Sequence, residues 1–198
     1  MKKMTILLLL LAVFIAVGVS GCLGGDDNTD NSTDNNSSNN STGSDDDLNY
    51  STNIVTVRDL PAGYEFLSTQ SVKSHGEGLG ITDVLYGYRG YYKFSNDSVN
   101  NATVYFYCFK TNSTDDAAKY YQQMKDSYES DYSTANVSSI TLNGHSATKF
   151  VTVSEDESAS GPNMIAWTRS NIIFVVKGQV KGETDYATIE SLAVASGL

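Results

Sequence analysis

The sequence predicts an α+β fold in which two helices pack on an antiparallel sheet. Three observations lead to this prediction. Residues 64–111 show strand patterns, a helix pattern begins at Ser113, and two hairpin patterns then precede a last helix. Strands that come in runs, rather than in strict alternation with helices, are typical of an antiparallel sheet with helices packed against it. Residues 48–198 are long enough for a single domain with a hydrophobic core.

The first part of this domain is expected to consist of strands. Residues 64–72, 81–94 and 102–111 alternate between two faces, and residues 53–58 fit a short edge strand. Gly87 and Gly90 indicate a bulge or a close approach within the second of these strands. A hairpin at Arg89-Gly90 is the alternative.

A glycine-rich segment, residues 74–80, separates the first two of these strands and contains His75. Its core, Gly76-Glu77-Gly78-Leu79-Gly80, superficially resembles a phosphate-binding loop. It does not lie between a strand and a helix, and no Lys-Ser/Thr pair follows it. We therefore expect a mobile loop.

The period changes at Ser113, where the first helix is expected to begin. A hydroxyl cap is followed by acids in the first turn, one of them three residues after Ser113. The residues expected to form the buried stripe of this helix follow at helical spacing: Ala117, Tyr121, Met124 and Tyr128. We interpret this stripe as core.

The second half is expected to hold two hairpins and a last helix. Residues 137–142 and 145–153 flank Asn143-Gly144, a strong hairpin signal. Residues 163–169 and 172–177 form the second hairpin, and within the latter the run 172–176 is apolar on both faces, which predicts a central strand. Thr184 can cap a last helix that Gly197 stops, and this helix is expected to bury three residues: Ile189, Leu192 and Ala193.

The chain begins with the pattern of a secretory signal. Lys2 and Lys3 precede an uninterrupted apolar run, residues 6–17, and small residues follow it. The segment Val19-Ser20-Gly21-Cys22 resembles a lipoprotein signal-peptidase site, although that family prefers leucine where this chain has Val19. The resemblance implies that residues 1–21 are removed and that Cys22 carries lipid. An uncleaved membrane helix over residues 4–23 is the alternative.

An acidic linker, residues 22–47, is expected to follow. It consists almost entirely of Gly, Asp, Asn, Ser and Thr, so it cannot bury enough apolar surface to fold. Asn-x-Ser/Thr sequons are dense in and after it, and they are candidates for glycosylation. Their asparagines are Asn31, Asn35, Asn36, Asn39, Asn40, Asn49, Asn96, Asn101, Asn112 and Asn136. Together with Cys22 this pattern resembles archaeal cell-surface lipoproteins.

Charge and composition exclude several classes of function. The chain has 13 Lys and Arg against 23 Asp and Glu, and no basic stripe, so we expect no nucleic acid partner. Its only other cysteine, Cys108, lies in a strand-like run and is expected to be buried. With two histidines and no recognisable catalytic motif, we expect no enzyme, no cofactor and no metal site. A hydrolase that uses carboxylates such as Glu65, Asp83 or Glu155 remains an alternative.

The segment from Val137 to Leu198 resembles the PsbP-like fold. It shares a paired hairpin, a central apolar strand after a Trp-containing strand, and a terminal helix. That resemblance implies an accessory subunit of a membrane complex, which is another alternative.

The high tyrosine count suggests a recognition surface. Alternation places Arg89, Tyr91, Tyr105 and Tyr107 on one sheet face, which we expect to lie opposite the first helix and to be half exposed. Cover by the second helix or the N-terminal segment, which would make this face ordinary core, is the alternative. Tyrosine has a rigid apolar body and a polar tip, which suits a sugar or a protein partner. The sequence thus predicts a lipoprotein on the outer face of the plasma membrane. It would act as a non-enzymatic binding module for a cell-surface protein or glycan.

Overall fold

Seven antiparallel strands form one sheet in the computed structural model of this chain, in the spatial order β1-β2-β3-β7-β6-β5-β4. The structure describes residues 50–97, 101–132, 135–152, 162–178 and 186–198. The strands are β1 (Tyr64–Lys73), β2 (Tyr86–Phe94), β3 (Ala102–Lys110), β4 (Ala135–Leu142), β5 (His145–Thr152), β6 (Met164–Arg169) and β7 (Ile172–Gly178). The predicted signal peptide, Cys22 and the acidic linker lie outside the described residues.

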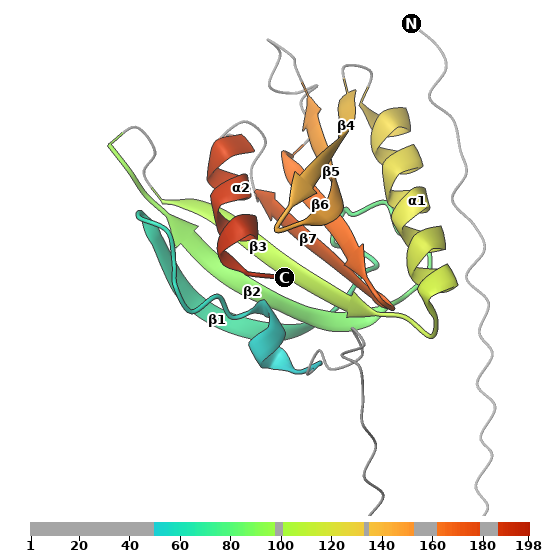
Figure 1. Cartoon of the computed structure of the whole chain (residues 1–198), viewed down its shortest axis with the longest axis horizontal. Coiled ribbons are helices and arrows are strands. Elements are labelled where there is room, and N and C mark those ends of the chain that lie inside the picture. Colours follow the sequence, from blue (N-terminus) through green and yellow to red (C-terminus); the bar gives the residue numbers. More distant parts are fainter. Residues whose placement is uncertain (1–49, 98–100, 133–134, 153–161, 179–185) are drawn as a thin grey trace, which may run out of the picture. The chain divides into compact units, whose positions relative to one another are not determined.

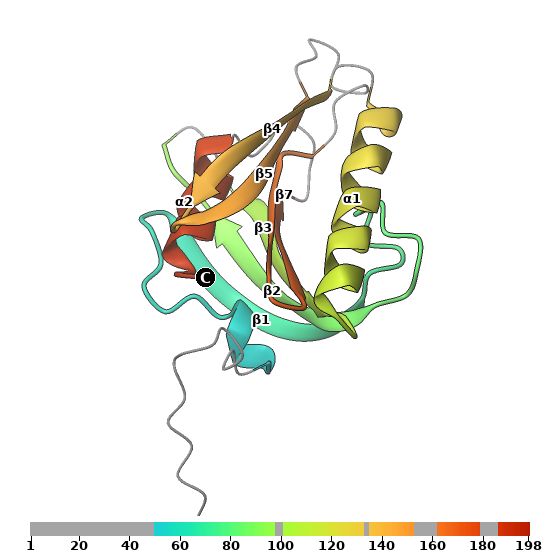
Figure 2. The same cartoon turned by 45° about the vertical axis from the view of Figure 1, so that its right-hand side comes forward.

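Two helices cover opposite faces of this sheet. Figures 1 and 2 show α1 (Thr114–Asp131) on one side and α2 (Tyr186–Ala195) on the other. Each helix closes its own hydrophobic cluster against the strands. The predicted α+β fold, an antiparallel sheet with two helices packed on it, is confirmed.

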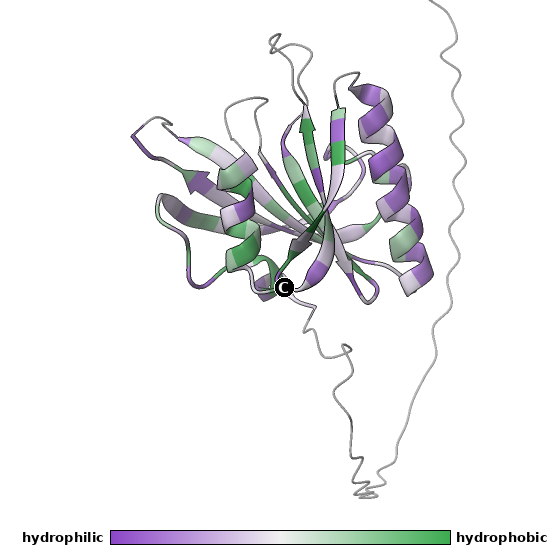
Figure 3. Ribbon diagram, turned by 45° about the horizontal axis from the view of Figure 1, so that its top comes forward, coloured by the Kyte–Doolittle hydropathy of each residue, from purple (hydrophilic) through white to green (hydrophobic). Residues whose placement is uncertain are grey.

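The helix α1 begins and packs as its sequence predicts. The Ser113 side chain accepts a hydrogen bond of 3.1 Å from the backbone N–H of Asp116, which caps the helix. Ala117, Met124 and Tyr128 are buried against the sheet. Figure 3 shows hydrophilic residues along much of the rest of α1, so one stripe of the helix supplies its packing.

Strand β7 is the centre of the sheet. It pairs with β3 on one side and with β6 on the other, and every residue in it is buried. This confirms the central, doubly covered strand. The turn between β4 and β5 is also as predicted, because Asn143 and Gly144 both have positive φ, 48° and 85°.

The segment before β1 differs from the prediction of an edge strand. Thr52–Val55 form a short 3₁₀ helix, η2, whose N-cap is Ser51. The hydroxyl of Tyr92 donates to the carbonyl oxygen of Val55 at 2.6 Å and accepts from the N–H of Val57 at 2.9 Å. A side-chain hydroxyl therefore takes the place of a strand partner. The predicted second strand is also shorter, since β2 begins at Tyr86.

The assignment of sheet faces to helices corrects one expectation. Val104, Phe106 and Cys108 lie in the cluster that includes α2 and η2, not beneath the first helix. Tyr107 lies in the cluster of α1, so the face that carries it is the α1 face. Tyr86, on the face of β2 opposite Tyr91, is 66% exposed.

Candidate functional site

The α1 face of the sheet is shared between the helix and the glycine-rich loop. Helix α1 packs mainly on β4, β6 and β7. Next to it, residues 74–80, here called the glycine loop, connect β1 towards β2 and bury Leu79 in the α1 cluster. The rest of this face, over β1, β2 and β3, is where the predicted recognition residues lie.

The base of the glycine loop is tied to the segment that leads into β2. Ser74 is buried, and its hydroxyl donates to the carbonyl oxygen of Asp83 and accepts from the N–H of Leu85, both at 2.9 Å. The backbone N–H of Ser74 also donates to the carbonyl oxygen of Leu85 at 2.8 Å. The loop expected to be mobile thus has defined partners at its start.

Glu77 holds the middle of the glycine loop against the sheet. Its Oε2 pairs with Nη1 of Arg89 at 2.9 Å and accepts from the hydroxyl of Tyr107, also at 2.9 Å. The side chains of Arg89 and Glu77 are each only 19% exposed. A charge-assisted pair that is partly shielded from water is stronger than a surface ion pair, so this contact stabilises the loop.

Lys177 lies under the same loop. Its ammonium donates to the carbonyl oxygens of Glu77 and Gly78, and the residue is 9% exposed. Burial lowers the pKa of Lys177 to about 8, because taking the ammonium out of water disfavours its charged form. A Cβ atom at Gly78 would lie 3.3 Å from Nζ of Lys177, so glycine allows this close approach.

Three of the predicted recognition residues form a surface that we call the tyrosine platform: Arg89, Tyr91 and Tyr105. The guanidinium of Arg89 lies 4.8 Å from the ring centre of Tyr105, which in turn is 5.2 Å from the ring centre of Tyr91. All three side chains are partly exposed. The distance from Arg89 to Tyr105 is within the range of a cation–π contact, which helps to hold the arginine over the aromatic surface.

The fourth predicted residue, Tyr107, has a different place. It is 1% exposed, beneath the glycine loop, and burial raises its pKa far above the usual range. Tyr107 therefore supports the platform from below through Glu77, and it is not available to a ligand.

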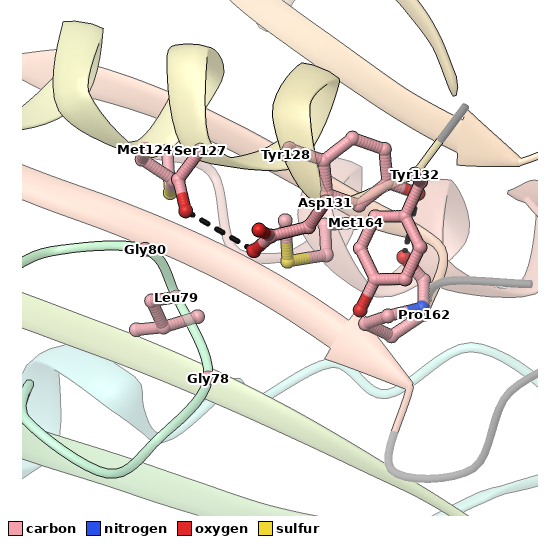
Figure 4. A pocket seen from close by; sticks show the side chains of 10 residues that line it. All are labelled: Gly78, Leu79, Gly80, Met124, Ser127, Tyr128, Asp131, Tyr132, Pro162 and Met164. Carbon is pink, nitrogen blue, oxygen red and sulfur yellow. Dashed lines mark hydrogen bonds between the residues drawn. The ribbon is translucent and has the colours of Figure 1, made fainter. Parts of the chain in front are cut away.

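A small pocket lies on the other side of the glycine loop (Figure 4). It has a volume of about 120 Å³ and lies between Gly78–Gly80 of the loop and the last turns of α1. Met124 and Met164 supply apolar walls, and Ser127 donates to Asp131 at its side. Ligand pockets usually measure at least ~300 Å³, so this space suits a few waters.

The structure separates the carboxylates that we considered for a hydrolase. Asp83 lies beside Ser74, at the far end of β1 from Glu65. At about 3.3 Å per residue, the extended segment from Glu65 to Ser74 is roughly 30 Å long, so Glu65 and Asp83 lie far apart. The two carboxylates of a glycosidase are only ~5–10 Å apart. Asp83 instead pairs with Lys119 at 3.8 Å. Glu155 lies outside the described residues.

The remaining candidate residues are placed as follows. Cys108 is buried, and burial raises the pKa of its thiol to about 12. The sequon asparagines that the structure describes, Asn96, Asn101, Asn112 and Asn136, are all exposed, and the other six lie outside the described residues.

Neither a metal-binding cluster nor a helix that could cross a membrane is present among the residues that the structure describes. Within residues 50–97, 101–132, 135–152, 162–178 and 186–198, no three His, Cys, Asp or Glu side chains are close enough to hold a metal ion. Neither α1 nor α2 has the length and apolar character that a membrane crossing requires.

Sequence reasoning missed three residues of this site: Gln70, Glu77 and Lys177. A lysine directly after the apolar run 172–176 was a usable signal, because a charge at the end of a buried strand needs partners. Gln70 and Glu77 had no such signal. Comparison of the chain with protein-family models, with curated proteins and with solved structures found no match.

Proposed function

We propose that this protein is a lipoprotein held by Cys22 on the outer face of the plasma membrane, and that residues 48–198 act there as a non-enzymatic binding module. The apolar run, the small residues before Cys22 and the acidic linker support the anchor. The exposed sequon asparagines of the folded part support a location where glycosylation occurs.

The observation that carries the binding proposal is the tyrosine platform. Two partly exposed tyrosine rings and an arginine in cation–π contact lie together on strands β2 and β3, on a part of the sheet that α1 leaves open. Aromatic rings of this kind give a partner a large apolar contact at a low cost in side-chain entropy. The base formed by the partly buried Glu77 and the buried Tyr107 positions Arg89 before any partner arrives.

Capture of cell-envelope material by the purified full-length protein in detergent tests the binding proposal. The double substitution Tyr91→Ala with Tyr105→Ala should abolish capture while the melting temperature changes by only a few degrees. Tyr86→Ala is the matched control, because it removes a more exposed tyrosine from the opposite face of the same strand. Undiminished capture by the double variant would show that the platform is not the binding surface.

The anchor has its own test. Intact-mass measurement of the membrane-extracted protein should show that residues 1–21 are missing and that the chain carries a lipid mass. Cys22→Ser should leave the protein uncleaved or released from the membrane. A wild-type mass that retains residues 1–21 without lipid would instead support the membrane helix over residues 4–23.

A further inference from the structure

We propose that the tyrosine platform binds an acidic sugar, a hexuronate, whose carboxylate is held by Arg89 and whose ring lies on Tyr105 and Tyr91. This inference rests on the proposed function and names the class of ligand that the same surface takes. Its starting point is a hydrogen-bonding position on Arg89 that the protein itself fills only in part.

The guanidinium of Arg89 has donors on two edges. Nη1 donates to Glu77, and on the other edge Nη2 donates to Oε1 of Gln70 at 2.7 Å. The neighbouring donor on that second edge, Nε, is buried and has no acceptor among the residues that the structure describes. A buried N–H without a partner costs free energy, so this edge lacks one acceptor.

A carboxylate matches this edge better than the amide of Gln70 does. Nε and Nη2 are parallel donors, and the two oxygens of a carboxylate can accept from both at once. Gln70 is exposed and offers a single neutral oxygen, so a ligand can displace it without unfolding the site. Gln70 thus occupies the position of a ligand carboxylate.

The local charge also favours an anion. Arg89 pairs with the carboxylate of Glu77, and the ammonium of Lys177 binds the backbone of the same residue. Lys177 donates to backbone carbonyls, which are neutral, so one positive charge of this cluster is unbalanced within the described residues. An incoming carboxylate would balance it in a place where partial burial strengthens the attraction.

The aromatic half of the platform points to a sugar as the carrier of that carboxylate. Tyr91 and Tyr105 are directly opposite each other on β2 and β3, and their ring centres are 5.2 Å apart. A pyranose ring has an apolar face that packs on such rings, while its hydroxyls remain in water. The platform lies in the interior of the sheet, where the strands already pair with each other, so it offers no free strand edge to an acidic peptide.

Calorimetric titration of the full-length protein in detergent tests this proposal. The probes are tetramers of glucuronate, galacturonate and mannuronate, together with the methyl ester of each, which keeps the sugar and neutralises the carboxylate. At least one acid should bind, and its ester should bind at least tenfold more weakly. No binding by any acid, or equal binding of acid and ester, would overturn the proposal, as would equally tight binding of a tetraglutamate.

Two substitutions of Gln70 provide the sharpest comparison. Gln70→Glu places a carboxylate on the edge formed by Nε and Nη2, so it should abolish hexuronate binding without lowering the melting temperature. Gln70→Ala vacates that edge and should bind at least as tightly as wild type. Ser71→Glu is the charge control, because it adds the same charge on the other face of β1 and should change affinity less than threefold.

Arg89→Lys completes the set, since lysine keeps the charge but loses the parallel donors. It should weaken hexuronate binding at least tenfold.

If Gln70→Glu bound the hexuronate as tightly as wild type, the assigned position of the carboxylate would be wrong. Failure of this inference is distinguishable from failure of the proposed function. If the platform captures envelope material but no hexuronate binds, only the ligand class is wrong.

Discussion

Replacing Lys177 with methionine should remove a pH dependence of stability that the wild type shows between pH 7 and pH 9. Methionine keeps the length and flexibility of the side chain and removes the charge. In the folded protein, burial lowers the pKa of Lys177 to about 8, whereas an unfolded lysine titrates near its ordinary 10.5. Glu77 and Arg89 are the charged groups that act on it, with opposite effects on its pKa.

The sign of the effect follows from the number of protons bound. From about pH 8 to about 10.5 the unfolded chain keeps the lysine proton while the folded protein releases it, so the free energy of unfolding rises with pH. The burial cost is fully present below pH 8 and disappears as pH rises. With a folded-state pKa of about 8, the free energy of unfolding should rise by about 1 kcal/mol between pH 7 and pH 9. The full difference between the folded and unfolded pKa of Lys177 corresponds to about 3 kcal/mol.

Urea unfolding of the full-length protein at pH 7, 8 and 9 measures this effect. The difference in unfolding free energy between wild type and Lys177→Met should move by about 1 kcal/mol in favour of the wild type, since other groups cancel. The measurements stop at pH 9 because tyrosine ionisation begins to act above about pH 10. Burial raises the pKa of Tyr92 to about 12, so the unfolded chain loses that proton before the folded protein does, and the free energy of unfolding then falls. A difference that stays constant or moves the other way would refute the assigned burial of the charge.

Three further predictions concern the loop, the core and the first helix. Gly80→Ala should lower the free energy of unfolding by about 2–5 kcal/mol, because φ is +71° and the new Cβ would lie 2.5 Å from Cβ of Ser127. Gly76→Ala is its control: φ is +89° but the space around it is open, so the same urea assay should show a loss of only ~1–2 kcal/mol. Equal costs would show that the loop does not press on α1. Cys108→Ser should lower the free energy of unfolding by about 1–3 kcal/mol, because it buries a hydroxyl. The native thiol, whose pKa is raised to about 12, should react with a thiol reagent only on unfolding. Rapid labelling of the folded protein would contradict its burial. Ser113→Ala should cost about 0.5–2 kcal/mol by removing the cap of α1, and an unchanged urea midpoint would show that the cap contributes nothing.

Much of the fold could be predicted because its signals are local. The hydroxyl of Ser113 caps the helix that follows it, and Asn143-Gly144 adopts the positive φ angles that its hairpin requires. The apolar run from Ile172 to Val176 is the central strand, since only a strand covered on both faces can be apolar on both. Each of these patterns acts within a few residues, so the sequence alone carries it.

Alternation along the strands also placed the recognition residues on one face, but it could not say which face. Arg89, Tyr91 and Tyr105 share a face, as predicted, yet that face carries α1 and the glycine loop. A period of two defines two equivalent sides of a strand, and the path of the connecting chain decides which helix covers each. The burial of Tyr107 followed from that choice.

The sequence by itself therefore determined most of the elements, the residues that share a strand face, and the N-terminal pattern around Cys22. Only the tertiary structure decided the site. Glu77 meets Arg89 across 12 residues of chain, and Lys177 reaches the same loop across 100. Such contacts depend on where the strands β2, β3 and β7 lie next to one another in the sheet. Local pattern cannot report them, because the free energy that forms them comes from partners distant in sequence.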